Sequence, residues 1–363
     1  MPRSLSRWII GASLLAGGLA LACATERGLE PTPGEYWLYA AVPGDPEGWI
    51  AVIDCATDSI VDTLRYGFQR GGVGVVASPD GRYLAVTGSG RPPLIWDVAR
   101  RMPIGYFSAP TLPPTFLPDA HLVIGTPYES TLVFSLPSVT PMGAWPVELY
   151  NAQKVPGRSW VMGTDHRGYP PPGDDWSKLA IYDYAKGREI DSVIISPDEQ
   201  GVGFQILTFC LSPDGRRLYA LGGGAGGGPS LVGYDLDRRQ FLFRQPVYSA
   251  GNCRVTPDGR EVWITDPGSN LASPIFPGLI VIFDAMAGTV LDTITTTGYP
   301  PRPTQPLFVL DIRFTPTGEK AYVNCRKWGT PILVIDTRTR QITKLIFGDS
   351  RNMAGWIDVA PVP

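Results

Sequence analysis

The chain has 363 residues with 42 glycines, 37 prolines and only 18% charged residues, and its formal net charge is −3. This composition suits short strands joined by many turns, and no long amphipathic helical pattern interrupts it. The slightly acidic balance argues against a nucleic-acid partner, because proteins that bind the phosphate backbone carry basic patches.

The N-terminal residues predict export and a lipid anchor. Arg3 and Arg7 precede an uncharged apolar stretch that is short for a membrane span and typical of a secretory signal. The small residues before Cys23 resemble a bacterial lipobox, so we expect a lipoprotein signal peptide over 1–22 and a lipidated Cys23 that holds the protein on a membrane. Residues 23–35 are then a tether in the cell envelope, on the outer face of the plasma membrane or in the periplasm or outer membrane. An ordinary signal peptide with an incidental cysteine is the alternative.

Beyond the tether, a short apolar run that ends in a polar residue, six times Asp, recurs seven times. Its copies begin 38 to 52 residues apart, a period typical of propeller blades. The seven copies are 51–54, 94–97, 132–135, 180–183, 232–235, 281–284 and 333–336.

A second phrase, typically Ser/Thr-Pro-Asp-Gly, alternates with the first. Pro sets φ at the start of a turn and Gly accepts the left-handed position at its end, so each copy predicts a hairpin and each repeat unit holds four strands. The copies are 78–81, 117–120, 155–157, 212–215, 256–259 and 315–318.

The two ends of the repeat region complement each other. Residues 355–361 match the strand that precedes the turn in the other units, and residues 36–40 match the strand that follows it. We therefore expect an all-β, seven-bladed β-propeller over 36–363, closed by N- and C-terminal strands that share one blade. Such closure removes the open edge of the ring.

The phrase Ile-Asp-x-x-Thr at 335–339, together with the Ser-Pro-Asp-Gly turn, resembles the YVTN family of bacterial β-propeller repeats over 36–363. The counterparts of the Tyr-Val-Thr-Asn phrase, at 321–324 and 262–266, depart from the family pattern. The resemblance implies a scaffold shared by surface proteins, amine dehydrogenase heavy subunits and lactonase-like enzymes. It therefore implies a fold more than an activity.

Few residues suit a metal or a cofactor. The only histidines are His121 and His166, so we expect no metal site, and we find no cofactor motif. The glycine run at 222–228 lacks the Lys-Ser/Thr of a phosphate-binding loop and reads as a strand connection. Besides Cys23 there are four cysteines, whose spacing leaves open whether they pair or stay as separate buried thiols: Cys55, Cys210, Cys253 and Cys325.

The strand before each turn is expected to line the central channel. Side chains alternate along a strand, so the third and fifth residues before the turn proline face the channel and the second and fourth face between blades. By this rule Cys210 faces the channel and Cys253 faces between blades, which argues against a bridge. Lys154 falls in the column between blades.

The predicted channel is polar on one side only. It receives Gly74, Val76, Pro113 and Thr115 from two blades and Asn252, Arg254, Asp311, Arg313 and Asp358 from three others. One interpretation is an ion-pair network, because buried charges need partners. The other is an anion pocket in which the two arginines bind a carboxylate or phosphate and the two aspartates hold them.

Aromatic, amide and guanidinium groups are expected at the mouth of this channel, where they suit a polar ligand or a protein partner. The full set of candidate ligand-binding residues is Arg254, Arg313, Asp311, Asp358, Asn252, Asn151, Gln153, Arg70, Tyr150, Tyr248, Arg351 and Asn352.

Three functions fit the sequence. A binding or scaffold lipoprotein, taking a small anionic ligand or a protein partner, is favoured because no nucleophile, base and orienting group form a recognisable set. A lactonase-like hydrolase would need an acid or base at the channel mouth. His166, in the long loop 165–176, is the candidate histidine for that role. A propeller subunit of a quinone-type dehydrogenase would need a separate chain that carries the cofactor.

Overall fold

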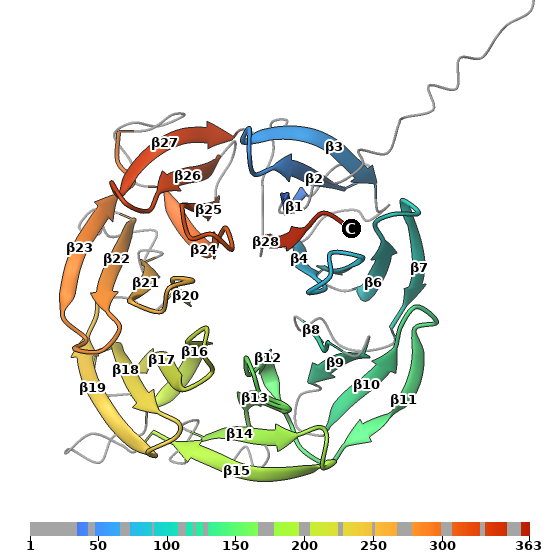
Figure 1. Cartoon of the computed structure of the whole chain (residues 1–363), viewed down its shortest axis with the longest axis horizontal. Coiled ribbons are helices and arrows are strands. Elements are labelled where there is room, and N and C mark those ends of the chain that lie inside the picture. Colours follow the sequence, from blue (N-terminus) through green and yellow to red (C-terminus); the bar gives the residue numbers. More distant parts are fainter. Residues whose placement is uncertain are drawn as a thin grey trace, which may run out of the picture.

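A computed structural model of the chain describes residues 35–42, 48–65, 73–88, 91–107, 114–118, 121–125, 130–165, 178–195, 204–223, 228–248, 251–266, 278–298, 307–326, 331–346 and 357–363. Every regular element in these ranges is a β-strand, and the strands form sheets arranged like blades around a central channel (Figure 1). The predicted all-β propeller is confirmed. No helix in the described ranges is long and apolar enough to cross a membrane.

The described strands form seven four-stranded antiparallel sheets, of which six use four consecutive strands each. The first three are β4 (Val73–Ala77), β5 (Tyr83–Gly88), β6 (Arg91–Asp97) and β7 (Met102–Tyr106); β8 (Thr115–Phe116), β9 (His121–Gly125), β10 (Thr131–Ser135) and β11 (Thr140–Trp145); and β12 (Tyr150–Lys154), β13 (Trp160–Thr164), β14 (Lys178–Asp183) and β15 (Arg188–Ile194).

The next three consecutive sheets are β16 (Gln205–Leu211), β17 (Arg217–Gly223), β18 (Ser230–Asp235) and β19 (Gln240–Pro246); β20 (Cys253–Val255), β21 (Glu261–Asp266), β22 (Leu279–Asp284) and β23 (Val290–Thr295); and β24 (Phe308–Phe314), β25 (Lys320–Arg326), β26 (Ile332–Asp336) and β27 (Gln341–Ile346).

The remaining sheet is composite. Its order is β28-β1-β2-β3, with β1 (Tyr36–Val42), β2 (Trp49–Asp54) and β3 (Ser59–Arg65) from one end of the described chain and β28 (Ile357–Pro361) from the other. β28 and β1 are antiparallel, and their register runs from Tyr36 opposite Pro361 to Ala40 opposite Ile357. The ends of the ring therefore meet inside one sheet, as Figure 1 shows.

The repeats do not give seven equal blades. Six sheets are continuous in the sequence and one is assembled from both ends of the chain. The inner strand β8 has only two residues and β20 only three, whereas β16 and β24 have seven. Pro114, which has no N–H to donate to a ladder, directly precedes β8 and accounts for its short length.

The structure explains why the repeated runs end in Asp. The Asp carboxylate accepts N–H groups of the turn that follows, as Asp235 does from Asp237 and Arg238 at 2.9 and 2.8 Å. The backbone then takes a left-handed φ at the fourth residue after the Asp or Ser in all seven copies: Asp58, Arg101, Val139, Gly187, Arg239, Gly288 and Arg340. The Asp side chain thus satisfies N–H groups that the tight turn leaves unpaired.

The apolar cores lie between neighbouring sheets. One cluster joins Tyr39 and Ile50 of the composite sheet to Leu84 and Trp96 of the next sheet. Another joins Trp263 of β21 to Val323 and its neighbours in β24 to β26. Each blade therefore buries both faces against its neighbours, and the fold depends on an unbroken ring.

Candidate functional site

Three of the inner strands have a backbone irregularity where they line the channel. The pairing register shifts in β12 between Tyr150 and Gln153, in β16 between Ile206 and Thr208, and in β24 between Val309 and Asp311. Such bulges redirect the side chains beside them, and they are common next to binding sites. Here they bring polar residues of three inner strands to the wall of one cavity.

This cavity lies in the channel and has a volume of about 650 Å³. Its wall is formed by the inner strands β4, β8, β12, β16, β20 and β24 and by residues beside them. The charged side chains that line it, among the described residues, are the cations Lys154, Arg254 and Arg313. The cavity therefore offers positive charge although the chain as a whole is acidic.

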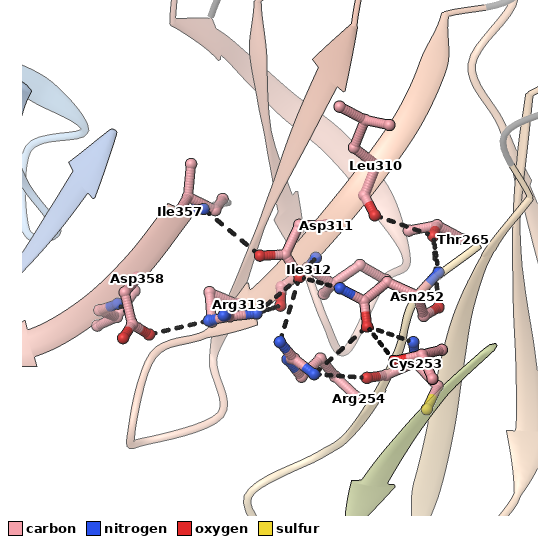
Figure 2. A network of polar contacts seen from close by, with 12 residues as sticks. Asn252, Cys253, Arg254, Thr265, Leu310, Asp311, Ile312, Arg313, Ile357 and Asp358 are labelled. Carbon is pink, nitrogen blue, oxygen red and sulfur yellow. Dashed lines mark hydrogen bonds and ion pairs between the residues drawn. The ribbon is translucent and has the colours of Figure 1, made fainter. Parts of the chain in front are cut away.

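A network around Asp311 holds both arginines (Figure 2). Asp311 Oδ1 accepts hydrogen bonds from Asn252 Nδ2 and from Arg313 Nη1, both at 2.7 Å, and lies 3.4 Å from Arg254 Nη2. The Asp311 side chain is 1% exposed, so it stands behind the guanidinium groups. Asn252 is itself fixed, because its N–H donates to Thr265 Oγ1 at 2.7 Å.

Asp358 extends the network across the closure of the ring. Its Oδ1 accepts from Arg313 Nε at 2.9 Å, and its Oδ2 accepts from the N–H of Ala77 in β4 at 2.9 Å. Asp311 Oδ2 also accepts from the N–H of Ile357 at 3.4 Å. These bonds tie β24, β28 and β4 together at the point where the two ends of the chain meet.

Uncharged groups add further hydrogen bonds between blades. Together with the network around Asp311, they form a belt of polar contacts along one side of the channel. Thr208 Oγ1 of β16 donates to Asn252 Oδ1 at 3.3 Å, and Gln153 of β12 donates to the carbonyl of Phe209. Thr115 of β8 donates to the carbonyl of Ala152 in β12. The polar side of the channel thus contains the ion pairs of the first interpretation, and uncharged groups add hydrogen bonds from blade to blade.

The two arginines are held to different degrees. Arg313 makes carboxylate contacts at 2.7 and 2.9 Å, whereas the contact of Arg254 with Asp311 is 3.4 Å and its shorter bond, 3.0 Å, goes to the carbonyl of Cys253. Burial and the nearby charge of Arg313 lower the pKa of Arg254. Burial acts in the same direction on Arg313, but Asp311 and Asp358 outweigh it and raise its pKa. Arg254 is therefore the less neutralised of the two arginines.

Lys154 lines the cavity although the alternation rule placed it between blades. Its Nζ donates to the carbonyl of Val155 at 2.6 Å and to that of Arg158, and it lies over the Tyr184 ring at 5.6 Å. Burial lowers the pKa of this amine. The amine is therefore held by the turn after β12 and by Tyr184, which packs against the apolar cluster between this sheet and its neighbour.

Of the other candidates, Asn151 and Gln153 line the same cavity from β12, and Asn151 has a left-handed φ of 52° at the bulge. Tyr150 is half-buried in β12, and Tyr248 is 76% exposed beyond the end of β19. Five candidates lie outside the described residues: Arg70, Arg351, Asn352, His166 and Cys23. The hydrolase and dehydrogenase-subunit alternatives stay predictions.

Of the two neighbouring cysteines, only Cys210 lines the cavity and Cys253 is completely buried, which agrees with the predicted alternation of side chains. Both belong to one buried cluster between β16 and β20, together with Tyr219. The pairing of β16 is regular from Thr208 to Leu211, so the alternation holds at Cys210. It does not keep the two cysteines apart, because they meet between neighbouring sheets. All four described cysteines are buried free thiols.

No protein-family model matches the sequence, and no curated protein is significantly similar to it. Among solved structures, 1426 chains match, so the likeness points to a common architecture. Hydrazine synthase of Kuenenia stuttgartiensis matches with a TM-score of 0.60 and 18% identity over 74% of this chain and 77% of that chain.

The dihydro-heme d1 dehydrogenase NirN, solved in complex with DHE, matches with a TM-score of 0.57 and 14% identity over 89% of this chain and 74% of that chain. Both neighbours are β-propeller proteins that belong to enzymes. At these identities the likeness shows the propeller fold alone.

Proposed function

We propose that this protein is a binding protein whose channel cavity takes a small anionic ligand with a carboxylate or phosphate group. The observation that carries the proposal is the arrangement of charge. Three cationic side chains line the cavity, while Asp311, the carboxylate that holds both arginines, is buried behind them. Guanidinium groups present N–H donors in a planar fork that suits both anions.

Arg254 is the residue expected to bind the anion. Its side chain is 22% exposed and its carboxylate contact is long, so it can move toward a ligand without breaking the belt. Arg313 is 15% exposed and bonds to two carboxylates at short distance, which suits a structural role. Asn151 of β12 lines the same cavity with an amide group suited to a further hydrogen bond.

We expect Arg254→Gln to weaken anion binding by about 1.5–3 kcal/mol, on the order of ten- to a hundredfold in Kd, because one charge-assisted bond is lost. The measurement is a thermal shift and a calorimetric titration with phosphate and with succinate, each compared with chloride at equal ionic strength. Arg260→Gln is the matched control, because the Arg260 side chain is 85% exposed and lies outside the cavity lining. If neither anion shifts the wild-type melt, or if Arg254→Gln binds equally well, the cavity is not an anion site.

The lipid anchor and the YVTN-type family are further parts of this proposal. The anchor is supported by the charged start, the apolar stretch and the small residues before Cys23. The family is supported by the repeated Asp-capped turns. Intact mass spectrometry of the protein from a bacterial envelope fraction should show a chain that begins at a lipid-modified Cys23, and Cys23→Ser should leave the precursor uncleaved. An unmodified mature chain that begins elsewhere contradicts the anchor.

A further inference from the structure

Two thiols meet beside the channel, in the joint between the sheets of β16 and β20. Cys210 lies opposite Tyr219 in the register of β16 and β17, and Cys253 Sγ contacts the carbonyl of the same Tyr219 at 3.7 Å. Both cysteines belong to one buried cluster. Burial first, and then a hydrogen bond between the two thiol side chains, raises the pKa of Cys210.

The two thiols differ in their access to solvent. Cys210 is 2% exposed and is part of the cavity wall, whereas Cys253 is completely buried behind it. Arg254 is close enough to Cys210 to favour its thiolate electrostatically, against the effect of burial. Cys210 is therefore the first of the two cysteines that a small reagent in the cavity meets, and Cys253 lies behind it in the same cluster.

We infer that Cys210 and Cys253 are a redox-active dithiol that closes into a disulfide between two blades. The oxidant is a small disulfide that enters the cavity. The Cys210 thiolate attacks one of its sulfurs, the S–S bond of the oxidant breaks, and a mixed disulfide forms while one thiol leaves. The Cys253 thiolate then attacks the Cys210 sulfur and releases the second thiol. Two protein thiols are oxidised, one disulfide is reduced, and the two protons leave on the released thiols.

The test uses the full chain with Cys23→Ser, so that no thiol outside the propeller reacts. The protein is treated with 2-hydroxyethyl disulfide, blocked with N-ethylmaleimide and mapped by mass spectrometry. We expect one cross-linked peptide pair, Cys210 with Cys253, and a rise of a few degrees in Tm that dithiothreitol reverses. Cys55 and Cys325 are internal controls, because they lie in two other buried clusters and should stay free. If Cys210 and Cys253 stay free thiols as well, or if the cross-link joins another pair, the inference is wrong.

Single variants test the order of the two steps. Cys253→Ser should trap the mixed disulfide on Cys210, seen as one added hydroxyethylthio group, whereas Cys210→Ser should leave Cys253 unmodified. Both variants should keep the wild-type circular dichroism spectrum, since Ser is close to Cys in size. Equal modification of Cys253 in the Cys210→Ser variant would contradict Cys210 as the entry point. The outcome does not depend on anion binding, so this inference and the proposed function can fail separately.

Discussion

Deleting residues 357–363 is expected to abolish the stable monomer. The deletion removes β28, whose Ile357 and Ala360 are 1% and 2% exposed and pack in two different clusters. It also exposes the edge of β1 and removes Asp358, which bonds to Arg313 and to the N–H of Ala77. Burial of one large aliphatic side chain alone contributes about 1.5–3 kcal/mol. The summed loss is of the order of the whole stability of a domain, about 5–15 kcal/mol.

Size-exclusion chromatography with light scattering and a thermal melt measure this loss. We expect aggregation through the open edge, or a fall of well over ten degrees in Tm. A circular permutant is the matched control. A short linker can join Pro363 to Glu35, because the Val362 N–H already donates to the carbonyl of Glu35 at 3.1 Å. The permuted chain then begins at Gly226. The permutant should be a monomer as stable as the parent chain. A soluble, monomeric truncation with an unchanged Tm would contradict closure through β28.

Asp311→Ala is expected to be the most destabilising single substitution in the channel, with a loss of about 3–5 kcal/mol in the free energy of unfolding. The change leaves Arg254 and Arg313 without their shared buried carboxylate and Asn252 Nδ2 without its acceptor. Removing one partner of a buried charge pair costs more than removing both, because an uncompensated charge stays behind.

Urea unfolding monitored by fluorescence measures the effect. Asp292→Ala is the control, because the Asp292 side chain is 46% exposed in its contact with Arg340 and such surface pairs contribute about 0–1 kcal/mol. Asp311→Ala combined with Arg313→Met should recover part of the loss, since it removes one of the two stranded cations. If Asp311→Ala costs no more than Asp292→Ala, the network does not stabilise the ring.

Local sequence signals were sufficient for the blades. The alternation of apolar residues predicts the strands, and the Pro-Asp-Gly turns and Asp-capped turns predict where they end. These turns can be read from the sequence because their hydrogen bonds join residues only a few positions apart. Asp235 with Arg238 and Ser212 with Asp214 are such local pairs. The same signals did not reveal that Cys210 and Cys253 meet, because these residues lie on neighbouring sheets and share one buried cluster.

The sequence by itself determined the strands, the turns and the residue types that gather at the channel. Only the tertiary structure decided which of these residues bond, because the deciding contacts join distant segments. The Asp358 bond to Ala77 spans 281 residues, and the Asn252 bond to Asp311 spans 59. A local pattern fixes the register within a sheet, whereas the offset between sheets is set by packing of whole faces. That packing buries Asp311 behind the two arginines and places the two thiols together.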